Sequence, residues 1–89
     1  MSQATWDRRT KDFEEAAGQI LRDSNEPLKV QNIARKAVER GLISPVGKTP
    51  DRFMYLVIRR ANARRAQEGS PHRFLRHERD GRVYYSVAE

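Results

Sequence analysis

The sequence predicts a small, mainly α-helical domain that ends in a β-hairpin. Apolar residues recur at helical spacing in three segments between residues 11 and 66. After residue 73 the spacing changes to alternation around Asp80-Gly81, the dipeptide favoured in two-residue hairpin turns. With 89 residues, the chain can bury one core. Three helices followed by a hairpin are the element order of a winged helix-turn-helix, so this fold is expected, with the hairpin as a C-terminal wing.

The first helix is expected over about residues 11–23. The Thr10 hydroxyl can accept a hydrogen bond from a free N–H of the first turn, and the acids that follow suit the positive end of a helix. Five positions at helical spacing in this segment are apolar: Phe13, Ala16, Ala17, Ile20 and Leu21. Residues 1–9 are expected to be a flexible N-terminal segment, which leaves residues 10–89 as the folded domain.

The second helix is expected over about residues 30–40 and shows the same spacing. Its apolar positions are Val30, Ile33, Ala34, Ala37 and Val38. Gly41 follows it and can adopt the left-handed conformation that ends many helices. Before this helix, Pro27 cannot continue the preceding one, and Leu28 is a lone apolar residue that could form a short strand.

The third helix is expected from Pro50 to about Ala66. Thr49 suits the N-cap, and Pro50 suits the first helical position, where no N–H is needed. The core-facing stripe is formed by Pro50, Met54, Val57 and Ala61. The outward face carries Arg52, Tyr55, Arg59 and Asn62. The second and third helices would form the helix-turn-helix.

The hairpin is expected to pair residues 74–78 with residues 82–87 across Asp80-Gly81. One face then carries Val83, Tyr85 and Val87. On the other face Arg79 opposes Arg82, and two like charges at this position would be relieved by a phosphate between them. Splayed, hydrated side chains at the hairpin tip are the alternative interpretation.

Charge is the strongest compositional signal. The formal net charge is +6, and residues 46–89 hold ten Lys/Arg against five acids, whereas residues 1–45 hold eight against seven. Fourteen of the 18 basic residues are arginine, which binds phosphate bidentately. Asp51 is the only acid in the third helix, so its arginines lack i, i+4 partners. Arg60 and Arg64 lie beside the apolar stripe, where their stems can cover the core. The pattern favours a polyanion as partner.

Several short motifs occur in a characteristic order. They are Phe13-Glu14-Glu15-Ala16-Ala17, Ile20-Leu21, Pro27-Leu28, Ile33 with Ala37, Gly41-Leu42-Ile43, Gly47-Lys48-Thr49-Pro50 and Arg73-Phe74. With these motifs, the segment from Thr10 to Val87 resembles a HARE-HTH domain. That family includes winged helices of additional-sex-combs-like chromatin proteins, of restriction-system proteins and of the bacterial RNA polymerase delta subunit. The resemblance implies DNA or chromatin recognition or, as in the delta subunit, association with polymerase.

A winged helix of this kind places its third helix in the major groove, where arginine can pair with guanine and asparagine with adenine. Arg52 and Tyr55 are the leading candidates for base contacts, followed by Arg59 and Asn62. Lys48 precedes a helix N-terminus, where a phosphate contact is expected and plain solvation is the alternative. The predicted DNA-binding residues are Lys48, Thr49, Arg52, Tyr55, Arg59, Asn62, Arg79 and Arg82.

Catalytic and metal-dependent functions are disfavoured. Gly47-Lys48-Thr49 resembles the end of a phosphate-binding loop, but the preceding glycine lies one residue too far away and no strand precedes it. His72 and His77 are the only histidines and there is no cysteine, so neither a metal nor a cofactor is expected. Glu14 and Glu15 are adjacent on a helix and point in different directions, so they do not form an acid–base pair. The protein is not expected to be an enzyme.

The function expected from the sequence is binding of double-stranded DNA through the third helix and the wing, in a transcription, chromatin or restriction context. The alternative is a protein-interaction module that docks on RNA polymerase, chromatin or a restriction partner. RNA is less favoured, because no interleaved exposed aromatic residues offer stacking platforms. Neither a signal peptide nor a membrane-spanning run is found, so an intracellular protein without a membrane or small-molecule partner is expected.

Overall fold

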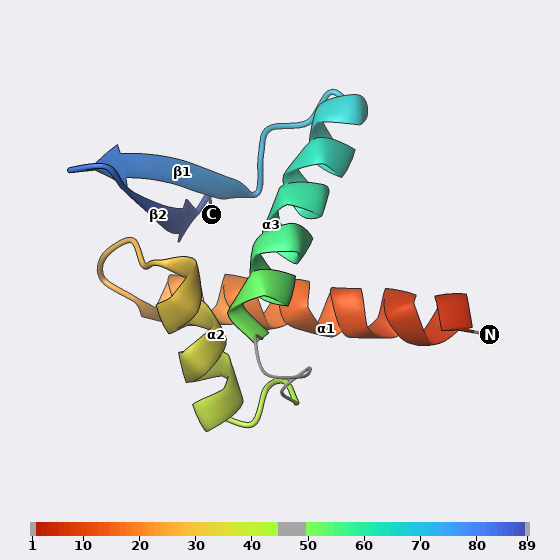
Figure 1. The fold of residues 1–89 in the computed structure, drawn as a ribbon. Helices are drawn as coiled ribbons and strands as arrows, with labels where there is room; N and C mark the ends of the chain where they lie inside the picture. Colours follow the sequence, from red (N-terminus) through yellow and green to blue (C-terminus); the bar gives the residue numbers. More distant parts are fainter. Residues whose placement is uncertain (1, 45–49, 89) are drawn as a thin grey trace.

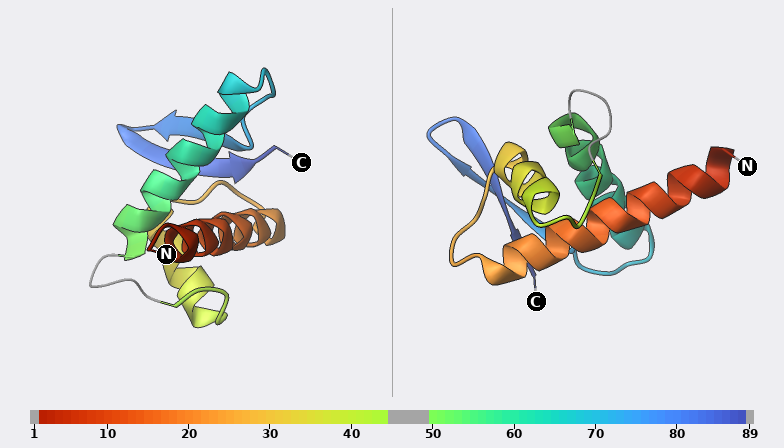
Figure 2. Two further views of the ribbon diagram at one scale, coloured as in Figure 1. Left: turned by 90° about the vertical axis from the view of Figure 1, so that its right-hand side faces the viewer. Right: turned by 90° about the horizontal axis from the view of Figure 1, so that it is seen from below.

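A computed structural model describes residues 2–44 and 50–88 of the chain. It contains three helices followed by an antiparallel hairpin, which confirms the predicted winged helix-turn-helix (Figure 1). The elements are α1 (Ser2–Asp23), α2 (Val30–Glu39), α3 (Pro50–Gln67), β1 (Phe74–Arg79) and β2 (Arg82–Val87). The N-terminal end of α1 projects away from the hairpin, which lies at the opposite side of the molecule (Figures 1 and 2).

Helix α1 begins at Ser2, so the predicted start at residue 11 was wrong. Neither glycine nor proline occurs before Thr10, and a residue that is able to cap a helix does not end one when the preceding residues can continue it. The Thr10 hydroxyl therefore lies within the helix, where its oxygen is buried and has no hydrogen-bond partner among the described residues. The flexibility and the domain boundary expected for residues 1–9 stay predictions.

The end of α2 follows the prediction from Gly41. This glycine has a φ of 71°, and its N–H donates to the Val38 carbonyl over 3.0 Å. The Leu42 N–H donates to the Ala37 carbonyl over 2.9 Å, which completes the paired bonds of a Schellman motif. The turn directs Ile43 into the core, where it is 8% exposed. A local signal thus ends the helix and sets the direction of the chain that leaves it.

The core forms where the apolar stripes of the three helices meet beneath the hairpin. Phe13 of α1 packs edge-on against Phe53 of α3, with ring centroids 4.7 Å apart and planes at 90°. Phe74 and Tyr85 extend this core into the hairpin, and both are buried. Because α3 packs on both α1 and the hairpin, its remaining face is directed to solvent.

The hairpin has the predicted register. Asp80 and Gly81 have φ values of 54° and 74°, as a type I′ turn requires, and Arg79 pairs with Arg82 across it. Leu28 forms an isolated bridge rather than a strand: its N–H donates to the Tyr85 carbonyl over 2.9 Å, and the Tyr85 N–H donates back over 2.8 Å. The wing is therefore tied to the connection between α1 and α2.

Candidate nucleic-acid interface

The exposed face of α3 carries three of the predicted contact residues. Arg52, Tyr55 and Arg59 are all exposed, and the Arg59 guanidinium lies 5.7 Å from the centre of the Tyr55 ring. This is within the range of a cation–π interaction, which holds the arginine against the helix surface. Arg52 has neither an ion-pair nor a hydrogen-bond partner among the described residues. Both positive charges are therefore available to an external anion.

The tip of the wing adds a second pair of arginines. Arg79 and Arg82 face each other across the type I′ turn, as predicted, and both are exposed. In the part of the chain that the structure describes, neither makes an ion pair. Like charges that are directly opposite on a sheet repel each other, so an anion between them would be stabilised.

A groove with a volume of about 530 Å³ joins the wing to α3 and to the start of α2. Its charged lining consists of Lys29, Arg52, Arg76, Arg82 and one acid, Asp51. Tertiary structure thus brings residues from four parts of the chain to one predominantly positive hollow. Sequence reasoning missed Lys29, which precedes α2, and Arg76, which was assigned to no face of the hairpin.

Two tyrosines supply the aromatic part of this groove. Tyr55 is 41% exposed, whereas Tyr85 is 4% exposed and lies at its base. Burial, and to a smaller extent the nearby Tyr55, raise the pKa of the Tyr85 phenol above its ordinary value, although Arg76 and Arg59 act in the opposite direction. The phenol therefore keeps its proton at neutral pH and can donate a hydrogen bond to an anion.

A family model for the HARE-HTH domain, the helix-turn-helix domain of ASXL proteins and restriction endonucleases, matches residues 11–79. The chain belongs to the HARE-HTH family. No curated protein and no solved structure gives a significant match to it. HARE-HTH domains are helix-turn-helix domains, which generally bind DNA. The matched segment of this HARE-HTH domain contains all of α2 and α3 and most of α1, and it ends with β1.

Asn62 has a different role from the one predicted. The outward orientation expected for it was wrong, because its side chain is half-buried and points at the first residue of the wing. The Asn62 Nδ2 donates to the Phe74 carbonyl over 2.9 Å, and the Phe74 N–H donates to Asn62 Oδ1 over 3.1 Å. The carboxamide thus bonds to Phe74 as a neighbouring strand would. It holds the wing against α3 and is not part of the interface described above.

Replacing Asn62 with alanine should destabilise the domain by about 1–3 kcal/mol, because both backbone groups of Phe74 lose their partner in a partly buried place. Urea unfolding followed by circular dichroism measures the change, with Gln67→Ala at an exposed site of the same helix as control. Amide hydrogen exchange at Phe74 should accelerate. Unchanged exchange at Phe74 would show that the carboxamide does not hold this strand.

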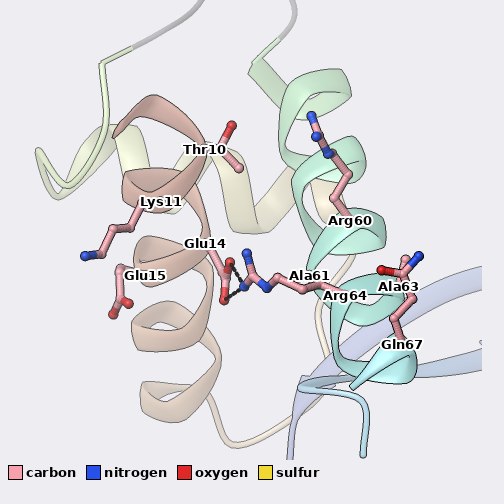
Figure 3. A pocket seen from close by; sticks show the side chains of 9 residues that line it. All are labelled: Thr10, Lys11, Glu14, Glu15, Arg60, Ala61, Ala63, Arg64 and Gln67. Atoms are coloured by element: carbon pink, nitrogen blue, oxygen red, sulfur yellow. Dashed lines mark hydrogen bonds and ion pairs between the residues drawn. The ribbon is translucent and has the colours of Figure 1, made fainter. Parts of the chain in front are cut away.

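A second arginine of α3 is also engaged inside the protein. Arg64 Nη2 lies 3.0 Å from Glu14 Oε1, as Figure 3 shows, while Arg73 Nη1 lies 2.7 Å from Glu14 Oε2. Glu14 is 8% exposed, and a Cβ on Gly18 would lie 2.7 Å from Arg73 Nη2, so the absence of a side chain there makes room for the guanidinium. This network joins α1 to both α3 and the segment that enters the wing.

The hollow around Glu14 and Arg64 lies between α1 and α3 and has a volume of about 640 Å³ (Figure 3). Lys11, Glu15 and Arg60 also line it, so it contains charges of both signs. It therefore offers a polyanion less than the groove beside the wing does. Glu14 is buried and Glu15 is exposed, in agreement with the predicted divergence of these two side chains.

The remaining predictions concern residues or groups that the structure treats in less detail. Lys48 and Thr49, predicted as a phosphate contact and an N-cap, lie outside the described residues, and their roles stay predictions. Within residues 2–44 and 50–88, no three histidine, cysteine or acidic residues are grouped as a metal site would require. In the same residues, no helix is long and apolar enough to cross a membrane.

Proposed function

We propose that this HARE-HTH domain binds double-stranded DNA by placing the exposed face of α3 in the major groove and laying the wing along the neighbouring backbone. The observation that carries this proposal is the groove beside the wing, in which Arg52 and Tyr55 of α3 meet Arg76 and Arg82 of the wing. A continuous positive surface on a helix and an adjacent hairpin suits a duplex, since the helix fits the major groove and the hairpin reaches the flanking phosphates.

The two parts of this surface have different tasks in the proposal. Arg52 and Arg59 contact base edges or the phosphates that border the groove, because arginine can pair with guanine O6 and N7 or with a phosphate. Tyr55 accompanies them through its contact with Arg59. Arg79 and Arg82 bind the backbone, where a phosphate relieves their mutual repulsion. Lys48 and Thr49 extend the backbone contacts at the start of α3.

The position of the wing supports this division. Leu28 bonds to β2 and Asn62 bonds to β1, so the hairpin is held at both of its long edges. Its tip is therefore presented at a fixed place relative to α3 instead of moving independently. Fixing two contact surfaces before binding lowers the entropy that binding must otherwise remove. The domain is proposed to act as a binding module without catalytic activity.

Binding should depend steeply on salt. With about four to six phosphate contacts, a plot of log affinity against log salt concentration should have a slope of about −4 to −5. Fluorescence anisotropy with a labelled duplex of about 20 base pairs, at several salt concentrations, measures this slope. A flat response would contradict the proposed backbone contacts. Absence of binding even at low salt would instead favour an acidic protein surface, such as one on RNA polymerase, as partner.

A further inference from the structure

The exposed face of α3 contains an apolar side chain among its arginines. Leu56 is 46% exposed, the largest fraction of any large apolar side chain in the described residues. Arg52 lies one helical turn before it, and Arg59 and Arg60 lie about one turn after it. Leu56 is not part of the buried core, so packing within the domain does not account for a leucine at this position.

The charge around Leu56 restricts what can cover it. The only acid of α3 is Asp51, which lies at the start of the helix and is half-buried. A second copy of the same face would be repelled by its own arginines, and an apolar partner without negative charge would have to desolvate them. The occupant must therefore combine negative charge on either side with an apolar group in the middle.

Duplex DNA has this combination in its major groove. Phosphates border the groove, and on its floor the C5-methyl group of thymine is the apolar group that base pairs present to a protein. A helix that directs arginines to both borders would direct a leucine between them to the floor. An apolar side chain there loses water on contact with the methyl group, whereas cytosine offers no such group at this position.

We propose that Leu56 contacts the C5-methyl group of a thymine and thereby makes the domain prefer an A·T pair at that position. The inference rests on the proposed function, because it requires α3 to lie in the major groove. It goes further by naming the base and the atom that are recognised. Removing one buried methyl contact should weaken binding about three- to fivefold.

The test removes the methyl group from the DNA and the leucine from the protein, separately and together. A preferred duplex is first selected from a random pool with the wild-type domain, and each thymine is then replaced singly by deoxyuridine, which keeps the charge and the base pairing. At one thymine, wild-type affinity should fall about three- to fivefold. Leu56→Ala should bind the parent duplex correspondingly more weakly, with no further loss on the uracil duplex.

The matched control is Leu75→Ala, because Leu75 is 42% exposed but lies at the start of the wing. This variant should keep both the affinity and the sensitivity to uracil. The inference is overturned if the pool yields no preferred sequence, if no uracil substitution weakens wild-type binding, or if Leu56→Ala is as sensitive as the wild type. Salt-dependent duplex binding would survive each of these outcomes, whereas loss of all duplex binding would overturn the proposed function as well.

Discussion

The Arg52→Glu/Arg59→Glu double variant should bind duplex DNA about 100-fold more weakly than the wild type, or weaker still, since each arginine contact contributes about 1–3 kcal/mol. The substitutions reverse two charges on the exposed face of α3 and place them against phosphates. Both residues are exposed, so the fold should be retained, which circular dichroism verifies. Anisotropy titrations at fixed low salt measure the loss.

The control for this variant is Arg8→Glu/Arg9→Glu, which changes the net charge by the same amount on exposed positions of α1. If α3 provides the contact surface, the control should lose much less affinity than the α3 variant. Equal losses in the two variants would mean that only overall charge governs binding, and would contradict the assignment of the interface to α3. The comparison therefore separates a specific surface from general electrostatic attraction.

The Glu14→Gln variant should lower the free energy of unfolding by about 3–5 kcal/mol, because it removes the carboxylate charge that faces Arg73 in a buried place. The side chains of Glu14 and Arg73 are each 11% exposed, and their closest atoms are 2.7 Å apart. For a domain whose total stability is about 5–15 kcal/mol, this loss is a large fraction. Urea unfolding at neutral pH measures it.

Glu15→Gln provides the control, since this neighbouring carboxylate is exposed and should change stability little. In addition, Glu14→Gln/Arg73→Met removes both charges and should recover part of the lost stability, because the buried guanidinium charge is removed as well. A Glu14→Gln variant as stable as Glu15→Gln would show that the buried pair contributes nothing measurable. Recovery in the double variant would assign the loss to the charge of the buried arginine.

Elements with local signals were predicted well. Gly41 ends α2, and Asp80-Gly81 forms the turn that sets the register of the hairpin. These conformations depend on residues within a few positions along the chain, so their causes are visible in the sequence. The start of α1 was missed for the opposite reason: Thr10 has a suitable hydroxyl for a cap, but nothing in the preceding residues stops the helix.

Contacts between distant residues could not be predicted. Glu14 meets Arg73 across 59 positions of the chain, and helical spacing alone places Asn62 on the outward face of its helix. Whether a polar side chain at the border of an apolar stripe turns inward depends on what lies opposite it. For Asn62 that is the backbone of Phe74, which is positioned only once the wing has folded onto α3.

The sequence by itself therefore determined the order of the elements, the ends of α2 and of the hairpin turn, the apolar stripes and the excess of arginine in the second half of the chain. These follow from spacing, turn chemistry and composition, which are local or additive properties. Tertiary structure decided which polar residues serve the fold and which face solvent. It buried Glu14, turned Asn62 toward the wing and gathered Lys29, Arg52, Arg76 and Arg82 around one groove, because only packing brings separate segments to the same place.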